Sequence, residues 1–491
     1  MATKGRQITT SSAQGWALAL ASAASFMVVL DLLVVATALS TIRRDLGASI
    51  EQLEWTVNAY MLSFAVLLMT AAALGDRFGR RRLFAAGLGL FAAASAACAL
   101  APTVGWLIAA RAVQGAGAAM VMPLALALLN AAFPPQRRGW AMGIFGGVTG
   151  LAALVGPVLG GAITQGIAWR WIFWLNVPIG LVAIPLVLGR IQESYGPRST
   201  MDIPGLGLGI GAALGLVWGL VRGNSAGWGS PEVIVALGAG ALLTVAFVAR
   251  EMRARAPMLP MRLFRSRAFS AGGAAIFFLN GSLTGAVFFM AQFQQTTLGQ
   301  GPLDAGLRLL PWGITPFLIA PRAGALADRL GERPLVVAGL LLQTAGMAWI
   351  AVIARPGLAY VTMIAPMVIS GCGFAIAIPA VTKSVVSSVA PDDIGRASGA
   401  FSTMRQLGGA FGVAIPAAVF AAAGSYASAR AFSDGFAPAI GVAAGLSLAG
   451  AAAGLALPRR RAATGSAPAP AAPAEHAALA EHARSATSGE D

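Results

Sequence analysis

The sequence contains few charged residues: they occupy 11% of its 491 positions, against roughly 25% in a soluble globular domain. A soluble surface needs charge for solvation, so a large core cannot explain this shortage. The composition is instead 57% hydrophobic, with a mean hydropathy of +0.74. The 61 glycines fit the same picture, because small residues let helices approach closely inside a bilayer. These observations exclude a soluble enzyme and predict an all-α membrane protein.

Cysteine and histidine are also scarce. Cys98 and Cys372 both lie inside apolar runs, and the two histidines, His476 and His482, lie near the C-terminal end. These numbers and spacings argue against a disulfide framework and predict neither a metal site nor a cofactor. The formal net charge is +15, but the basic residues sit in short segments between apolar runs. That placement is typical of membrane-protein loops, so we expect no nucleic-acid partner.

Fourteen apolar runs are long enough to cross a bilayer, which takes about 20 residues. The first follows Lys4 and Arg6 and is too long for the core of a signal peptide, so we expect it to remain as a span. The expected spans are 16–40, 54–74, 83–102, 106–130, 140–165, 169–190, 204–222, 232–250, 270–294, 305–327, 335–354, 359–388, 402–424 and 436–457.

The distribution of Lys and Arg predicts the orientation of these spans. With the N-terminus inside the cell, most of the 34 basic residues fall in cytoplasmic segments. The exceptions are Arg43, Arg44, Arg170, Arg222, Arg308, Arg355 and Arg430 on the outer side, and Arg111, Arg322 and Arg405 within spans. We therefore expect a multi-pass protein of the cell membrane with both termini in the cytoplasm.

An internal repeat predicts the domain organisation. The segment GDRFGRRR at 75–82 follows the second span, and ADRLGERP at 327–334 follows the tenth, which maps the first six spans onto the last six. Repeats of this kind place a substrate path between two halves that rock about it. We expect a cytoplasmic N-terminus (1–15), a six-helix half (16–190), two inserted central helices (191–255), a second six-helix half (256–457) and a disordered Ala/Pro-rich tail (458–491).

The GDRFGRRR segment resembles the signature loop of the major facilitator superfamily, with Ala72 where the family pattern opens with glycine. An acid at a helix end, followed by glycine and several arginines, can form a charged latch. The alternative is an ordinary basic loop of the positive-inside kind. The resemblance implies a cytoplasmic gate formed by Asp76, Arg77, Gly79, Arg80 and Arg81, with Asp328 and Arg329 as its echo in the second half.

Two further segments resemble motifs of the same superfamily. LIAARAVQGAGAAMVMP, in the fourth span, matches the family's arginine-containing motif at Arg111 and Gln114; the alternative is an arginine that reaches the membrane interface. GLAALVGPVLGG, in the fifth span, resembles the antiporter motif, which in the family marks exporters that exchange substrate for protons. It is carried by Gly150, Gly156, Pro157, Gly160 and Gly161; the alternative is close helix packing with no meaning for transport.

The segment WRWIFWLNVPIG at 169–180 resembles the fourteen-spanner drug:proton antiporter branch of the superfamily. GRASGAFSTMRQLGGAFGVA at 395–414 is similar to the same branch, and its Arg405 and Gln406 are interpreted as gating or packing residues near the cytoplasmic side. The resemblance covers residues 16–457. It implies a major facilitator fold with spans arranged six plus two plus six around a central cavity.

Asp31 is the one acid that lies deep in an expected span. An acid inside a membrane indicates function by default, although a structural role remains the alternative. Arg111 lies at a similar depth, so we expect the two to approach each other across the cavity and to couple protons to transport. Glu54 stands at the outer start of the second span and is expected to be solvated. Asn58 occupies a position at which some relatives that export divalent cations carry an acid, which disfavours dicationic substrates.

Polar side chains within spans are candidates for the substrate cavity, namely Asn58, Tyr60, Gln114, Asn280 and Gln292. The sequence therefore predicts a monomeric proton-coupled antiporter in the lipid bilayer that exports small amphipathic toxic compounds, cationic or neutral, as in multidrug or antibiotic efflux. Two alternatives stay open. One is a dedicated exporter of a single natural product or metabolite, and the other is a membrane sensor that transports nothing.

Overall fold

The computed structural model describes residues 9–196, 202–254, 257, 259, 261–389 and 394–459. Within these ranges the regular structure is helical. The elements are α1 (Thr9–Leu46), α2 (Ile50–Phe78), α3 (Arg80–Ala99), α4 (Val104–Ala132), α5 (Pro135–Gly166), α6 (Trp171–Trp174), α7 (Asn176–Arg190), α8 (Ile203–Ala226), α9 (Pro231–Arg253), the 3₁₀-helix η1 (Met261–Arg265), α10 (Arg267–Thr296), α11 (Pro302–Arg308), α12 (Leu310–Leu330), α13 (Glu332–Ile353), α14 (Val361–Val386), α15 (Ile394–Ala423) and α16 (Ala429–Leu455).

Local sequence signals explain several helix ends. Ser49 begins α2 with a capping box, because its hydroxyl accepts from the Gln52 amide while the Gln52 side chain accepts from the Ser49 amide. The turn from α2 to α3 passes through Gly79 at φ +106°, and the turn from α12 to α13 passes through Gly331 at φ +86°. Both angles favour glycine. The two segments of the internal repeat therefore make the same kind of sharp turn.

Thirteen helical segments are long and apolar enough to cross a membrane. They include α6 and α7 together as one stretch, Trp171–Arg190. The span expected at 305–327 is not among the thirteen. The structure divides it at Leu309 into α11 and α12, and α12 contains Pro311, Pro316 and Arg322, which reduce its apolar character.

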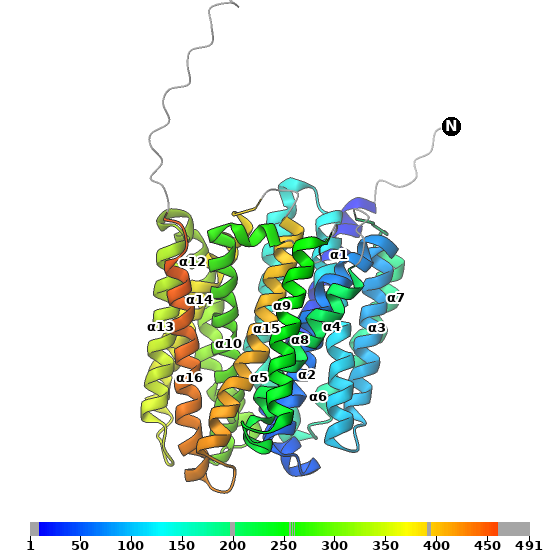
Figure 1. Cartoon of the computed structure of the whole chain (residues 1–491). Coiled ribbons are helices and arrows are strands. Elements are labelled where there is room, and N and C mark those ends of the chain that lie inside the picture. Colours follow the sequence, from blue (N-terminus) through cyan, green and yellow to red (C-terminus); the bar gives the residue numbers. More distant parts are fainter. Residues whose placement is uncertain are drawn as a thin grey trace, which may run out of the picture. The chain divides into compact units, whose positions relative to one another are not determined.

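Two groups of helices lie on either side of the molecule in Figure 1, with α1–α4 and α7 at the right and α10, α12, α13, α14 and α16 at the left. We call α1–α7 the first group and α10–α16 the second group. The groups meet where α2 packs on α15 and where α5 packs on α11 and α12. The helices α8 and α9 pack on each other, and α8 also packs on α2 and α15.

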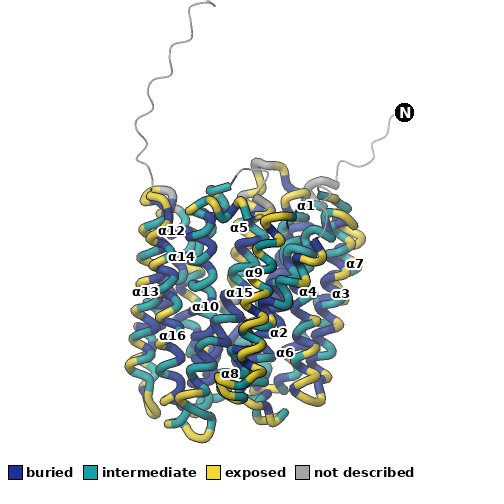
Figure 2. The backbone as a smooth tube through the Cα atoms, in the orientation of Figure 1, coloured by how far each residue is buried: buried dark blue, intermediate teal, exposed yellow. Residues whose placement is uncertain are grey.

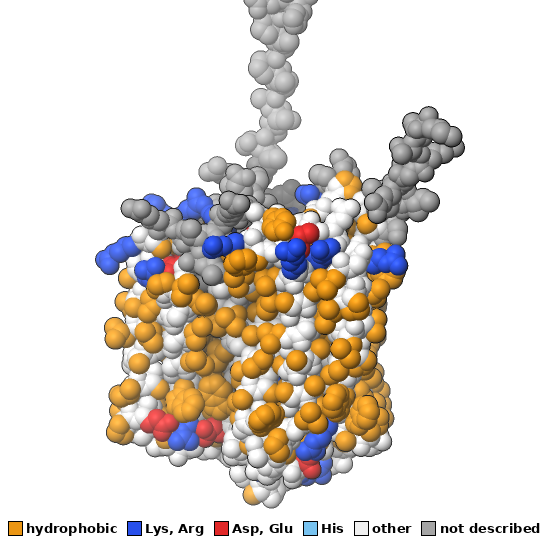
Figure 3. Space-filling view, turned by 90° about the vertical axis from the view of Figure 1, so that its right-hand side faces the viewer, with side chains coloured by type: hydrophobic (Ala, Val, Ile, Leu, Met, Phe, Trp, Pro, Cys, Tyr) orange, Lys and Arg blue, Asp and Glu red, His pale blue; other side chains and the backbone are white. Residues whose placement is uncertain are grey.

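The surface and the interior are consistent with a membrane environment. Buried positions concentrate on the inner sides of the helices (Figure 2), and hydrophobic side chains form a broad band between two rims that carry the charged residues (Figure 3). Large apolar side chains such as Leu181, Val235 and Val352 are exposed on this band. So much exposed apolar surface is unfavourable in water and fits lipid.

Candidate functional site

A cavity of about 2460 Å³ lies between the two groups. Its walls come from α1, α2, α4 and α5 on one side and from α10, α12, α14 and α15 on the other. It opens at the face where α1 begins and α16 ends, because its lining includes Asp76, Arg80, Arg262 and Arg396 at the helix ends there. At the opposite helix ends the described lining comprises residues at the start of α12, of which Leu309 and Trp312 are buried. The cavity therefore has a single mouth in the described part of the chain, on that face, which we call the open face.

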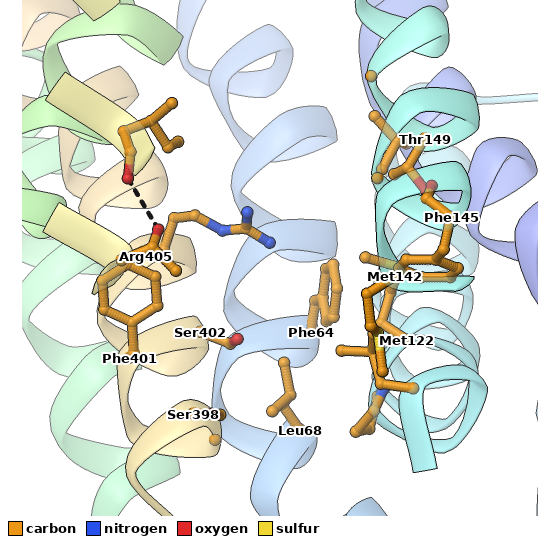
Figure 4. A pocket seen from close by; sticks show the side chains of 18 of the residues that line it. Phe64, Leu68, Met122, Met142, Phe145, Thr149, Ser398, Phe401, Ser402 and Arg405 are labelled. Atoms are coloured by element: carbon orange, nitrogen blue, oxygen red, sulfur yellow. Dashed lines mark hydrogen bonds between the residues drawn. The ribbon is translucent and has the colours of Figure 1, made fainter. Parts of the chain in front are cut away.

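The middle of the cavity is mostly apolar. Figure 4 shows Phe64 and Leu68 on α2 facing Met122, Met142 and Phe145 across the space, with Phe401 and Arg405 projecting from α15. Aromatic and methionine side chains give a wall that adapts to flat apolar ligands. The arrangement suits a hydrophobic small molecule with few polar groups.

The other end of the cavity is closed by direct contact between α5 and α11. A Cβ atom on Gly161 would lie 2.2 Å from the carbonyl oxygen of Pro302, and one on Gly306 would lie 2.2 Å from the carbonyl oxygen of Pro157. Only glycine permits so close an approach of the two backbones. The side-chain oxygen of Gln165 also accepts a 3.0 Å hydrogen bond from the Leu303 amide. These contacts seal the first group against the second at what we call the closed face.

A second set of polar contacts joins the groups near the closed face. The Gln295 side-chain amide of α10 donates to the Thr37 carbonyl of α1 at 2.9 Å. Within the second group, Tyr426 donates to the side-chain oxygen of Gln292. Burial raises the pKa of Tyr426, in the loop before α16, so its hydroxyl remains a donor. The Arg43 guanidinium lies 4.1 Å from the centroid of the Tyr426 ring.

The glycines of the expected antiporter motif lie in three different environments: against α1, against α11 and beside the cavity. A Cβ on Gly156 would meet Leu33 of α1 at 2.8 Å, and one on Gly160 would meet the Val34 carbonyl oxygen at 2.7 Å, so both bring α5 against α1. Gly161 faces α11, as described above. Gly150 has open space beside it and lines the cavity, as does Pro157. The motif thus lets α5 touch α1 and α11 at once.

Asp31 lies in the packed interior of the first group and is 1% exposed. One carboxylate oxygen pairs with Nη1 of Arg111. The other accepts hydrogen bonds from the side-chain amides of Gln114 and Asn176, both at 2.8 Å. Ser95 completes the network by accepting from Gln114 at 2.6 Å. Residues from α1, α3, α4 and α7 therefore converge on a single buried carboxylate.

Arg111 is fully buried and has several partners besides Asp31. Its Nε donates to the Thr56 carbonyl at 3.1 Å and its Nη1 donates to the side-chain oxygen of Gln114 at 2.7 Å. Its Nη2 is buried without a hydrogen-bond partner among the described residues. The guanidinium also lies 4.2 Å from the centroid of the Tyr60 ring. The structure brings the two charged residues of the sequence prediction into direct contact, but inside the first group rather than across the cavity.

Sequence reasoning missed two members of this network. Ser95 is one of many small residues in α3, and nothing in its local pattern distinguishes it. Asn176 belongs to a segment that we used only to recognise a family branch. Its amide within an apolar helix was a usable signal, because a buried amide needs partners.

The expectation that Glu54 is solvated is wrong. Glu54 is 2% exposed, and its Oε2 is buried without a hydrogen-bond partner in the described part of the chain. One turn further along α2, Asn58 is fully buried, and neither atom of its amide group has such a partner. The end of α2 is covered by neighbours, since Trp55 packs on Trp218 of α8 with ring centroids 5.5 Å apart. The sequence indicates only how far along α2 Glu54 lies, and that depth did not reveal that a neighbouring helix covers it.

The loop expected to form a gate lies at the open face. Asp76 pairs with Arg80 at 2.7 Å, one turn along the chain, and both line the cavity mouth. Arg77 is exposed, with its guanidinium 5.3 Å from the centroid of the Phe78 ring. The matching residue Arg329 is exposed at the end of α12, while the side chain of Asp328 lies outside the described residues. Asp76 and Asp328 are therefore not brought together by any described contact.

The segment after α7 holds this loop, which the sequence did not predict. Glu193 accepts from the backbone amides of Arg81 at 2.8 Å and Arg82 at 3.3 Å, the first turn of α3. The Arg81 side chain donates to the carbonyl of Ile191 at 3.2 Å rather than reaching toward lipid. A lone acid in a basic segment could have indicated Glu193.

The five polar candidates for the cavity lie elsewhere in this conformation. Tyr60 donates to the Val28 carbonyl at 3.2 Å, Asn280 donates to the Arg405 carbonyl at 2.8 Å, and Gln292 accepts from Tyr426. Gln114 belongs to the Asp31 network, and Asn58 is buried in the first group. None of the five is among the described residues that line the cavity.

Comparison with known proteins is consistent with this architecture. The chain is 35% identical over 404 residues to the tetracenomycin C resistance and export protein of Streptomyces glaucescens, covering 82% of this chain and 75% of that one. It is 36% identical over 410 residues to the puromycin resistance protein of Streptomyces alboniger, covering 82% and 80%. It is 34% identical over 399 residues to multidrug resistance protein Stp of Mycobacterium tuberculosis, covering 81% and 74%.

Solved structures share the fold. A bacterial homologue of the human lysosomal transporter Spinster, described as inward-facing and unoccupied, aligns with a TM-score of 0.66 at 16% identity, covering 92% of this chain and 97% of that one. The nucleoside transporter NupG aligns with a TM-score of 0.62 at 14% identity, covering 90% and 99%. The sequence model of the Major Facilitator Superfamily matches residues 21–413 of this chain. The chain therefore belongs to the Major Facilitator Superfamily and is a multi-pass membrane transporter.

Proposed function

We propose that this chain is an efflux transporter that exports small amphipathic toxic compounds in exchange for protons. The observation that carries the proposal is a charged network around Asp31 and Arg111, buried directly behind the wall of a large apolar cavity. Val29 and Leu33, two residues to either side of Asp31, line that cavity. The names of the relatives, which refer to antibiotic resistance and export, support the same reading.

We further propose that the chain belongs to the fourteen-spanner branch. In this arrangement α11 and α12 together form the fourteenth span, α8 and α9 are inserted between two six-span halves, and both termini lie in the cytoplasm. The basic residues at the rim of the open face support this orientation (Figure 3). The cavity then faces the cytoplasm, from which an exporter takes its substrate.

The contacts of Asp31 suggest how a proton could be coupled to movement. In the present state the carboxylate accepts hydrogen bonds from three side chains on two other helices, α4 and α7, and one of these donors is the Arg111 guanidinium. Protonation would remove its attraction to Arg111 and loosen α1 from α4. Because Gly156 and Gly160 press α5 against α1, a shift of α1 would be passed to the α5–α11 seal. The protonation state of Asp31 would thus bias which face is open.

The loop containing Asp76 would act at the cytoplasmic mouth. Its arginines are tied to the segment that leads toward the central helices, through Glu193 and the Ile191 carbonyl. Movement of the mouth would therefore displace this segment as well. We propose that Asp76, Arg77, Gly79, Arg80 and Arg81 form the cytoplasmic gate in this way.

The test uses inverted membrane vesicles that contain the full chain. Puromycin or tetracenomycin C is added outside, a proton gradient is imposed with acid inside, and uptake is followed with and without nigericin, which collapses the gradient. We expect uptake that depends on the gradient for several unrelated compounds. Uptake of one compound alone would favour a dedicated exporter of a single natural product or metabolite. Uptake that nigericin does not change would refute proton coupling.

A further inference from the structure

The charged groups that line the cavity are mostly arginines. The described lining contains five of them, Arg80, Arg262, Arg322, Arg396 and Arg405, against the two acids Asp76 and Asp202. Both acids are already paired: Asp76 with Arg80 at 2.7 Å, and Asp202 with Arg250 at 2.8 Å. The described lining therefore carries more positive than negative charge, and both of its acids already form ion pairs with arginines.

Arg405 is the deepest of these charges. It lies about eleven residues from the start of α15, which corresponds to roughly 16 Å along the helix. Asp76, Arg80 and Arg396 lie within a few residues of helix ends at the mouth. Arg322 is also inside a helix, but its Nη1 already donates to the Leu318 carbonyl at 2.8 Å. A ligand in the apolar middle of the cavity thus meets Arg405 first.

The Arg405 side chain lacks a partner in the described part of the chain. Its Nε is buried without a hydrogen bond, and no described acid forms an ion pair with it. Its backbone is fixed, because its carbonyl accepts from Asn280 at 2.8 Å. Figure 4 shows the guanidinium leaving α15 toward Phe64, with Phe401 and Ser402 beside it. Arginine keeps its charge, so a guanidinium that faces the cavity in this way can bind an anion through charge-assisted hydrogen bonds.

We propose that Arg405 binds the acidic group of an aromatic substrate, so that the cavity selects amphipathic organic anions. A guanidinium holds a carboxylate or a phenolate by charge-assisted hydrogen bonds, which a carboxylate can accept in pairs. Phe64, Phe145 and Phe401 supply faces for the ring system. This inference rests on the proposed export function. It replaces the expectation of cationic or neutral substrates with an expectation of anionic ones.

The proposal is tested by the binding of two dyes to the purified full chain in detergent. Fluorescein and rhodamine 123 share the same three-ring scaffold, but fluorescein carries a carboxylate and a phenolate whereas rhodamine 123 is an esterified cation. Fluorescence anisotropy gives the Kd of each without any gradient. We expect fluorescein to bind at least about tenfold more tightly, and Arg405→Gln to weaken it roughly 10- to 100-fold with rhodamine 123 unchanged, which is the range of a charge-assisted hydrogen bond.

Two further variants make the result specific. Arg405→Lys keeps the charge and should retain part of the fluorescein affinity, and Arg322→Gln removes a charge whose guanidinium already has a carbonyl partner and should change either Kd by less than about threefold. Unchanged rhodamine 123 binding shows that each variant is folded. If Arg405→Gln weakened the binding of both dyes equally while the denaturation temperature stayed unchanged, the proposal would be overturned. Arg405 would then shape the cavity or pair with another residue of the chain in a different state. Tighter binding of rhodamine 123 to the wild type, or no saturable binding of fluorescein, would also overturn it.

The outcome is separable from that of the export function. A chain that binds fluorescein through Arg405 but moves no compound in vesicles would refute export and leave the anion site in place. A chain that exports puromycin but binds both dyes equally would refute the anion site alone.

Discussion

Removal of one partner of the Asp31–Arg111 pair should destabilise the first group strongly. In Asp31→Asn the new side chain keeps an oxygen that can accept from Gln114 and Asn176, so the amide contacts survive in part. Arg111 keeps Gln114 and the Thr56 carbonyl, but it loses the only opposite charge bonded to it within the described residues. An uncompensated buried charge costs about 3–5 kcal/mol of unfolding free energy.

The assay is reversible unfolding of the purified chain by SDS in mixed micelles, followed by circular dichroism. We expect Asp31→Asn and Arg111→Gln each to lose about 3–5 kcal/mol, while the double variant loses at least about 2 kcal/mol less than the sum, because it leaves no unpaired charge. The matched control is the exposed pair of Arg170 and Asp45, 2.7 Å apart with side chains 38% and 45% exposed. Asp45→Asn should cost less than about 1 kcal/mol.

Additive losses in the double variant would refute the reasoning, because they would mean that the two residues stabilise the chain independently. Equal losses for Asp31→Asn and Asp45→Asn would refute it in another way, since burial would then make no difference. The same Asp31→Asn chain, tested in vesicles, should retain dye binding but lose uptake driven by the proton gradient. Uptake as in the wild type would exclude Asp31 as the coupling acid.

Three further changes have definite expected outcomes. Gly161→Val should abolish uptake in vesicles because its side chain cannot fit against α11, whereas Gly150→Ala, beside open space, should leave uptake near wild type; equal activity of the two would contradict the close seal. Glu193→Gln should lower the unfolding free energy by about 1–2 kcal/mol in the SDS assay, because the Arg81 amide then loses a charged acceptor; no change would show that the segment after α7 does not hold the loop. Glu54→Gln should leave the unfolding free energy unchanged or raise it, because burying a neutral amide costs less than burying a carboxylate whose oxygen has no described partner. A decrease of about 3 kcal/mol or more in the unfolding free energy, as is expected for Asp31→Asn, would reveal an unrecognised cation beside Glu54.

Much of the fold could be predicted because its signals are local. Apolar runs, capping residues such as Ser49 and the repeated turn glycines Gly79 and Gly331 each act over a few residues. The break between α11 and α12 escaped prediction, because an apolar run with three prolines is equally compatible with one helix or two. The positions of Asp31 and Arg111 along their helices could be estimated from helix rise alone, which is why their proximity was predictable.

The lateral surroundings of a side chain are a different kind of information, as the two buried acids of the first group show. Asp31 and Glu54 are both carboxylates enclosed by helices, yet one is bonded to Arg111, Gln114 and Asn176 and the other has an oxygen with no described partner. What covers Glu54 comes from a distant part of the chain, since Trp218 of α8 packs on its neighbour Trp55. Helix periodicity fixes the depth and face of a residue but not which helix comes to lie opposite. The same limit hid the role of Arg405, which the sequence assigned to gating or packing, because a guanidinium within a span can be paired, exposed to lipid or directed into a cavity, and only the neighbouring helices decide among these.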